Sequence, residues 1–168
     1  MIAETPRTLL RLLAEDDAPF VVELLNDPDF LRFIGDKGVR TLEDAQAYVR
    51  NGPLASYATY GFGLFLVVRK TDRIPIGFCG LLQREYLPVP DIGYAFLPAH
   101  RGAGFAVESG SAVLEYGRRQ HGLSRVMAMT HPDNAGSIRV LERLGLSFER
   151  RFRHDTDPHE VLLFAREL

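Results

Sequence analysis

The chain has 168 residues, of which 46% are hydrophobic and 25% are charged, and its formal net charge is −2. A chain of this size can bury one substantial core, so we expect a single domain over residues 1–168. The charge balance excludes the basic surface of a general nucleic-acid-binding protein. No apolar stretch approaches membrane-spanning length and the N-terminus has no long apolar segment, which predicts a cytoplasmic protein with neither nucleic acid nor membrane as partner.

A metal centre is not expected either. Cys79 is the only cysteine, which excludes an internal disulfide and a thiolate cage, and it lies in an apolar run that predicts burial. The run His154-Asp155-x-Asp157-x-His159 contains metal-ligating residue types. Because Asp157-Pro158 is a turn signal and no further ligand follows nearby, we interpret this run as a solvated hairpin tip.

The first sixty residues are predicted to form a short strand followed by helices. The expected elements are a strand over 8–13, helices over 18–25 and 29–34, a loop over 35–40, and a helix that follows Thr41 and runs to about Arg50. Thr41 and Asp44 have the spacing of a capping box, which favours a helix start. Asn51-Gly52-Pro53 is expected to break that helix. The residues up to Tyr60 could then be a last turn or a loop.

The remaining residues are predicted to alternate between strands and helices. Strands are expected over 62–68, 74–83, 91–97 and 126–130, helices after residue 104 and over 135–144, and a closing hairpin over 147–153 and 160–165. Asn134 is well placed to cap the helix over 135–144, and Gly122 and Gly145 are typical residues for helix ends. The pattern predicts an α/β (α+β) fold.

The stretch over 91–108 holds the strongest functional signal. Its strand ends at Pro98, and a turn with Gly102 and Gly104 leads directly into a helix. Helix starts have unpaired N–H groups and the positive end of the helix dipole, so this turn could bind a phosphate. Val107 does not fit the dinucleotide fingerprint, and Phe105 does not fit a P-loop. A plain turn whose glycines serve only close packing is the alternative.

Two motifs together resemble the GNAT superfamily of acetyl-CoA-dependent N-acetyltransferases. Arg101-x-x-Gly104-x-Ala106 is similar to the pyrophosphate loop of that family, and the run from Asn134 to Gly145 resembles its second cofactor helix. The opening from Leu9 to Asp29 is similar to the branch with the ribosomal-protein N-terminal acetyltransferases. The resemblance implies one domain with a mixed, twisted sheet of about seven strands and helices on both faces.

The resemblance also implies where acetyl-CoA binds. The fourth strand, over 91–97, would splay from the fifth, over 126–130, and the pantetheine arm would lie between them. Asn134 would reach this arm or would only cap its helix, and Ser137 would lie near the sulfur. The implied cofactor residues are Phe96 and Leu97 through their backbone for pantetheine, Arg101 through its charge, and the N–H groups of Gly102, Ala103, Gly104, Phe105 and Ala106 for the pyrophosphate.

Acetyl transfer to an amine needs a base for the amine proton and an acid near the leaving thiolate. The tyrosine that the family commonly uses as acid is replaced by Leu141, so Ser137 is the candidate acid; a helix residue that only satisfies local backbone groups is its alternative. Asp91 is the first candidate base and Glu85 the second, although acids beside a turn are often only solvated. Tyr94 could line the acceptor site or belong to the core.

The expected function is therefore the transfer of an acetyl group from acetyl-CoA to a primary amine, directly, in a ternary complex. The acceptor would be a protein N-terminal amine or a small-molecule amine, bound among loops that include the hairpin tip at 153–159. The alternative is a catalytically inactive CoA-binding regulatory or interaction module, and a nucleotide-binding protein is a third possibility. The protein is expected to need no metal and to be a monomer or homodimer.

Overall fold

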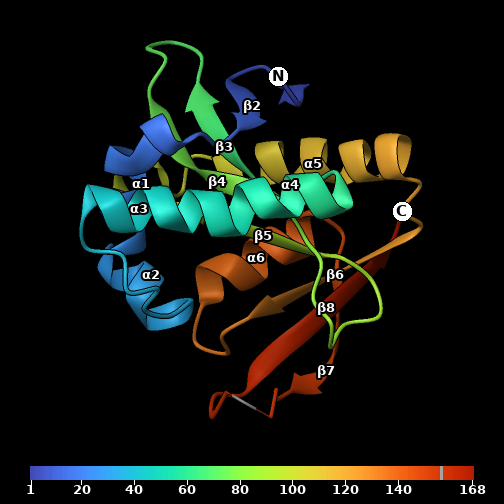
Figure 1. Ribbon diagram of the computed structural model, residues 1–168. Coiled ribbons are helices and arrows are strands. Elements are labelled where there is room, and N and C mark those ends of the chain that lie inside the picture. Colours follow the sequence, from blue (N-terminus) through green and yellow to red (C-terminus); the bar gives the residue numbers. More distant parts are fainter. Residues whose placement is uncertain (156) are drawn as a thin grey trace.

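The computed structural model describes residues 1–155 and 157–168. Its centre is one eight-stranded sheet with the strand order β1-β2-β3-β4-β5-β6-β8-β7 (Figure 1). The strands are β1 (Ala3–Glu4), β2 (Thr8–Leu12), β3 (Leu64–Arg69), β4 (Pro75–Leu82), β5 (Asp91–Phe96), β6 (Arg125–Thr130), β7 (Ser147–Phe152) and β8 (Val161–Glu167). The mixed α/β fold is confirmed, and the two-residue strand β1 accounts for the difference from the expected seven strands.

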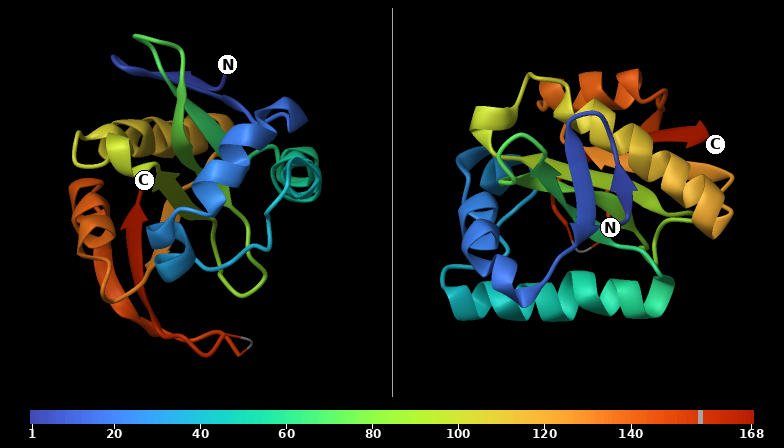
Figure 2. Two further views of the ribbon diagram at one scale, coloured as in Figure 1. Left: turned by 90° about the vertical axis from the view of Figure 1, so that its left-hand side faces the viewer. Right: turned by 90° about the horizontal axis from the view of Figure 1, so that it is seen from above.

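Helices cover both faces of this sheet (Figure 2). They are α1 (Ala18–Leu25), α2 (Pro28–Phe33), α3 (Leu42–Val49), α4 (Ala55–Tyr60), α5 (Phe105–His121) and α6 (Ala135–Arg143). Along β3 the side chains alternate: Phe65 packs into the core beneath α5 and α6, and Leu66 packs into the core beneath α1 to α3. Cys79 is fully buried, as expected. Within the described residues, no helix is both long enough and apolar enough to cross a membrane.

The expected break at Asn51-Gly52-Pro53 is wrong. The chain passes from α3 into α4 through one wide π-helical turn, Arg50–Leu54, so that both form one continuous rod in Figure 1. Pro53 is buried within that turn. A proline has no N–H to donate and its ring clashes with the carbonyl four residues earlier, and the wider turn accommodates both problems. The helix ends instead at Gly61, whose φ of 80° only glycine adopts readily.

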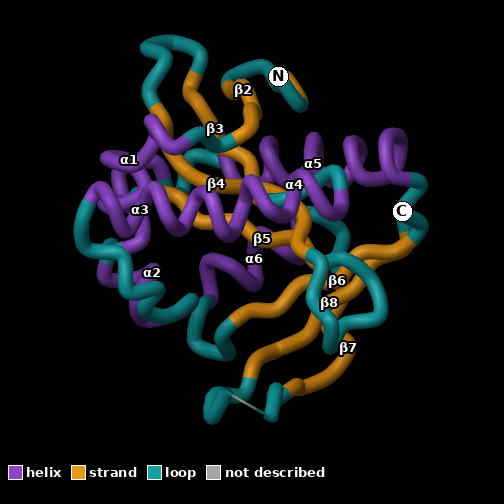
Figure 3. Tube along the Cα trace, in the orientation of Figure 1, coloured by secondary structure: helices purple, strands orange, loops and turns teal. Residues whose placement is uncertain are grey.

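The sheet is divided between β5 and β6, the pair that lies at its centre in Figure 3. These strands are parallel, and Asp91 opposite Met127 is the register pair that joins them within the described residues. The Met127 N–H donates to the Pro90 carbonyl (3.0 Å) beside that pair. All other neighbouring strands pair antiparallel over more residues, apart from the two-residue β1. From Asp91 onward, the side of β5 that faces β6 therefore has no strand partner.

Candidate active site

The turn before α5 presents a row of unpaired backbone donors. Gly102 (φ 74°) and Gly104 (φ 85°) are both in the left-handed region, and Gly104 is the N-cap of α5 without any side-chain cap. Among the residues that the structure describes, none accepts a hydrogen bond from the N–H groups of residues 102–106. Five unpaired donors at the positive end of a 17-residue helix form a site suited to an anion.

Arg101 precedes this turn, but its side chain points to other partners. Its Nε donates to the Phe96 carbonyl (2.9 Å), Nη1 donates to Asp29 (2.7 Å), and Nη2 donates to Asp27. Asp27 is buried and also caps α2 by accepting from the Phe30 N–H. Two carboxylates therefore neutralise the charge that we expected near the pyrophosphate. In this structure Arg101 fastens the turn to the start of α2.

The backbone of β5 divides between its two neighbours. The Leu97 N–H donates to Ile76 of β4 (3.1 Å), and the Leu97 carbonyl accepts from the His100 N–H (3.0 Å). Successive N–H groups of a strand point to opposite sides, so those of Phe96 and Tyr94 point away from β4, toward the side left open by β6. Phe96 therefore fits the expected contact with a pantetheine arm. Leu97 does not, because its backbone groups are already paired.

A pair of hydroxyls joins β5 to α6. Tyr94 is half-buried, and its Oη lies 2.9 Å from the Ser137 Oγ and donates to the Ser137 carbonyl (3.0 Å). Burial raises the pKa of Tyr94, so the phenol stays protonated. The Asn134 Oδ1 accepts from the Ser137 N–H (3.1 Å), which confirms Asn134 as the N-cap. Leu141 is buried in the core and contributes no polar group.

Asp91 lies at the closed end of the division between β5 and β6. It is 2% exposed, and its Oδ1 accepts from the Nε of Arg84 (2.9 Å). Burial raises the pKa of Asp91, while the charge of Arg84 counteracts part of that effect. Glu85 is exposed and forms no hydrogen bond or ion pair with the described residues. The structure thus places only Asp91 inside the fold.

The two candidate groups lie on opposite faces of the sheet. Tyr94 packs against the core beneath α5 and α6, whereas Ala95 and Leu97 pack against the core beneath α1 to α3. Side chains alternate along a strand, so Asp91 points to the same face as Ala95 and Leu97. Ser137 and Tyr94 are therefore on one side of the division between β5 and β6, and Asp91 is on the other.

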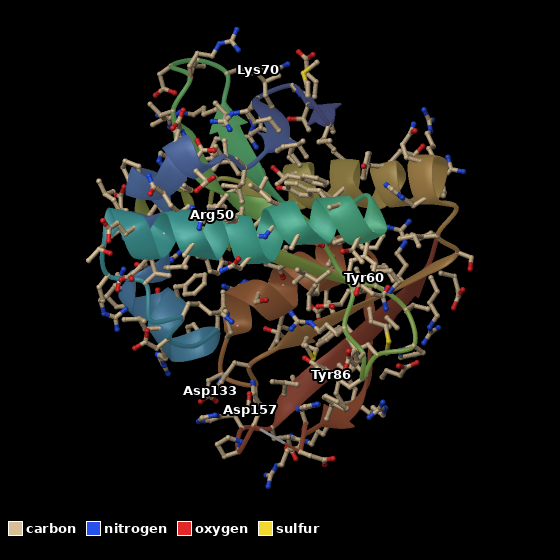
Figure 4. All side chains as sticks on the ribbon, in the orientation of Figure 1. Arg50, Tyr60, Lys70, Tyr86, Asp133 and Asp157 are labelled. Carbon is tan, nitrogen blue, oxygen red and sulfur yellow. The ribbon has the colours of Figure 1, made fainter. Side chains whose placement is uncertain are left out.

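A chain of contacts connects Asp91 to the β7–β8 hairpin. Arg84 lies 3.3 Å from the Tyr86 hydroxyl through its Nη1, and the Tyr86 ring stacks on Phe152 with its centroid 5.7 Å away. The Tyr86 and His154 rings are 4.1 Å apart. Figure 4 shows Tyr86 and Asp157 at this end of the molecule. The predicted hairpin tip includes Thr156, which lies outside the described residues.

The hairpin tip brings Asp157 and His159 together, with 3.0 Å between the Asp157 Oδ1 and the His159 Nδ1. Within the described residues, no group of three histidine, cysteine or acidic side chains is arranged to hold a metal ion.

Two arginines near the site were not singled out from the sequence. Arg84 holds Asp91, and Arg7 reaches the glycine turn from the turn between β1 and β2. Arg84 is only seven residues from its partner, but Arg7 and Ala103 are 96 residues apart. A local pattern of residue types carries no information about a contact of that length.

Comparison with known proteins supports the resemblance to the GNAT superfamily. The family model described as the GNAT acetyltransferase domain matches residues 7–147. An uncharacterized N-acetyltransferase, YnaD, from Bacillus subtilis (strain 168), is 30% identical over 149 residues, which cover 89% of this chain and 84% of the relative.

Two solved structures share the fold over nearly the whole chain. A GNAT-family acetyltransferase from Bacillus anthracis has a TM-score of 0.81 at 26% identity and covers 98% of this chain and 96% of its own. RimL, a ribosomal L7/L12 alpha-N-protein acetyltransferase solved with coenzyme A, has a TM-score of 0.79 at 20% identity, and the match covers 99% of this chain and 97% of RimL. The Rim-type enzymes are thus among the structural neighbours. The chain belongs to the GNAT acetyltransferase family and is an acetyl-CoA-dependent N-acetyltransferase.

Proposed function

We propose that the chain transfers the acetyl group of acetyl-CoA directly to a primary amine, with both substrates bound at once. The acceptor is a protein N-terminal amine or a small-molecule amine. One observation carries the proposal: a buried carboxylate, Asp91, and a hydroxyl pair, Tyr94 with Ser137, lie on opposite faces of the sheet where β5 and β6 separate. An amine approaching from the face of Asp91 and a thioester lying between β5 and β6 would meet between the carboxylate and the hydroxyl pair.

The residues of this chain fit acetyl-CoA, which supplies an activated acetyl thioester. The N–H groups of residues 102–106 suit the pyrophosphate because they are unpaired and lie at the start of α5. The Phe96 N–H points toward the pantetheine path between β5 and β6. The Asn134 Nδ2 donates to no described residue, so it is free to bind the same arm while Oδ1 caps α6.

Asp91 is the proposed base. An amine attacks only when it is neutral, so a group near the acceptor must take its proton. Arg84 occupies the Asp91 Oδ1, while Oδ2 receives no side-chain donor from the described residues. Burial raises the pKa of the Asp91 carboxyl, which makes its carboxylate a stronger base, and the hydrogen bond from Arg84 keeps the carboxylate oriented. Glu85 is the second candidate and has only its exposure in its favour.

Ser137 is the proposed partner of the leaving sulfur, and Tyr94 supports Ser137 through a hydrogen bond between the two hydroxyls. Each hydroxyl has one proton to donate. The single proton of Tyr94 can be donated to the Ser137 carbonyl or, alternatively, to the Ser137 Oγ, and in the second arrangement the proton of Ser137 is free to turn toward a third atom. The distance of 2.9 Å between the two oxygens permits this arrangement. Because the pKa of Tyr94 is raised, the phenol keeps its proton for this role at neutral pH.

The pH dependence of the variant Asp91→Asn tests the assignment of the base. Turnover should fall by roughly 10²-fold at neutral pH and recover partly at high pH, where the free amine is abundant. Glu85→Gln is the matched control, because it removes a neighbouring carboxylate that has no partner, and its profile should follow the wild type. A pH–rate profile of Asp91→Asn that superimposes on the wild type would exclude Asp91 as the base.

A further inference from the structure

Arg7 lies against the glycine turn from a distant part of the chain. Its Nη1 donates to the Ala103 carbonyl (2.9 Å), and its guanidinium carbon lies 4.3 Å from the centroid of the Phe105 ring. A Cβ built on Gly104 would be 3.3 Å from the Arg7 Nη2. The turn between β1 and β2 that carries Arg7 lies beside the start of α5 in Figure 2. The guanidinium is therefore directly beside the unpaired N–H groups.

The side chain of Arg7 is held in this position by Glu108, in the first turn of α5. The Glu108 Oε2 accepts from the Arg7 Nε (2.7 Å), and Oε1 accepts from the Arg7 backbone N–H (2.8 Å). Thr5 is buried and donates to the same Oε1 through its hydroxyl (2.6 Å). Because Glu108 fixes both the backbone and the Nε of Arg7, the orientation of the guanidinium does not depend on a ligand.

The remaining donors of Arg7 are uncommitted. A guanidinium has five N–H donors, and the described residues accept from only the Nε and Nη1 of Arg7. The Arg7 side chain is 46% exposed and faces one carboxylate. Arg101, by contrast, uses Nε, Nη1 and Nη2 and faces two carboxylates. The planar fork of an arginine suits phosphate oxygens. Arg7 keeps three N–H groups without an acceptor among the described residues, including both on Nη2, whereas each Nη atom of Arg101 already donates to a carboxylate.

We propose that Arg7, and not Arg101, is the arginine that binds the diphosphate of acetyl-CoA. This inference rests on the proposed position of the diphosphate at residues 102–106. Arg7 adds charge-assisted donors to the N–H groups of the turn, and Glu108 positions it. Arg101 is a positioning residue that ties the turn to α2.

Binding of unacetylated ligands tests this proposal without any acceptor. Calorimetry would compare CoA with dephospho-CoA, which lacks the 3′-phosphate, for the wild type and Arg7→Gln. Hydrogen bonds to charged groups contribute about 1.5–3 kcal/mol, so Arg7→Gln should weaken both ligands about ten- to hundredfold. Acetylpantetheine, which has no diphosphate, would serve as acetyl donor in a second arm, and its kcat/KM should be unchanged in Arg7→Gln.

Arg11→Gln is the matched control, because Arg11 is similarly exposed (42%) and also pairs with one carboxylate, Asp17. It should bind CoA as the wild type does. Arg101→Gln should weaken CoA binding less than Arg7→Gln does, because Arg101 supports the turn but does not contact the diphosphate. Arg7→Lys, which keeps the charge without the fork, should give an intermediate affinity for CoA and replaces Arg7→Gln if that variant does not fold.

Several results would overturn the proposal. Unchanged CoA affinity in folded Arg7→Gln would do so, and so would an equal loss with acetylpantetheine, which would indicate a structural role. A loss with CoA but not with dephospho-CoA would place the contact at the 3′-phosphate instead. Wild-type protein that binds CoA but acetylates no amine would contradict the proposed function, while the binding comparison would still test Arg7.

Discussion

Removing the Tyr94 hydroxyl with Tyr94→Phe should lower both stability and turnover, and the two losses have different causes. The ring keeps its place in the core, so the loss is limited to the hydrogen bonds with the Ser137 Oγ (2.9 Å) and carbonyl (3.0 Å). Each such bond contributes about 0.5–1.5 kcal/mol net. Ser137 is half-buried and water can replace part of the loss, so we expect about 1–2 kcal/mol of lost stability.

The effect on turnover depends on the order in which the two hydroxyls act. If Ser137 meets the leaving sulfur, Ser137→Ala should lower kcat by roughly 10²-fold, because its hydrogen bond strengthens as charge develops. Tyr94→Phe should lower kcat by only about tenfold, because the serine hydroxyl remains. Since Tyr94 acts through Ser137, the double variant should be no slower than Ser137→Ala alone. The KM for acetyl-CoA should change little.

Steady-state release of the CoA thiol gives kcat for the four proteins of this cycle, and urea unfolding gives their stabilities. Tyr116→Phe is the control, because its hydroxyl donates to the Gly61 carbonyl (3.2 Å) away from the site. That variant should lose stability but keep kcat. Losses of kcat that add in the double variant would refute the relay. Wild-type kcat in Ser137→Ala would reduce Ser137 to a residue of the helix cap.

Gly104→Ala and Gly102→Ala should each lose about 1–2 kcal/mol of stability, because both positions have a left-handed φ. Calorimetry should show the larger loss of CoA affinity for Gly104→Ala, because its new Cβ would lie 3.3 Å from the Arg7 Nη2. Equal CoA affinities of the two variants would contradict this prediction. Asn134→Ser should keep the helix cap and its stability, and wild-type CoA affinity in this variant would limit Asn134 to capping. Because the pKa of Asp91 is raised in the folded state, the protonated carboxyl favours folding. This contribution to the free energy of unfolding is fully present below about pH 4, the pKa of an unfolded Asp, and is lost as pH rises through the folded pKa. In urea unfolding at several pH values, the stability of Asp91→Asn relative to the wild type should therefore increase as pH rises. A stability difference that stays constant with pH would refute the direction of the pKa shift.

Local patterns in the sequence were sufficient to predict most elements of the fold. Period-two alternation located β5, and the helix signals at Thr41, Asn134, Gly122 and Gly145 all act as predicted. These signals depend on neighbours within a few residues, which is why they can be read from a single chain. The π turn at Pro53 could not be predicted in this way, because its stability depends on burial against the rest of the fold.

The partners of the charged side chains were harder to predict than the elements. Arg101 directly precedes the glycine turn in the sequence, but Asp27 and Asp29, more than 70 residues away, decide where its charge points. The opposite holds for Arg7, which has no local signal and is brought to Ala103 by the pairing of β2 with β3 and the packing of α5. Long-range packing sets the direction of such side chains, and residue spacing does not encode it.

The most direct test of the proposed function is acetylation of matched peptides that differ only at the N-terminus. The chain and acetyl-CoA would be incubated with a panel of peptides with free N-terminal amines, the same peptides with blocked N-termini, and small primary amines. We expect CoA thiol release that depends on a free amine and a product that carries one acetyl group on that amine. Tight CoA binding without transfer to any amine of the panel would contradict the proposed function.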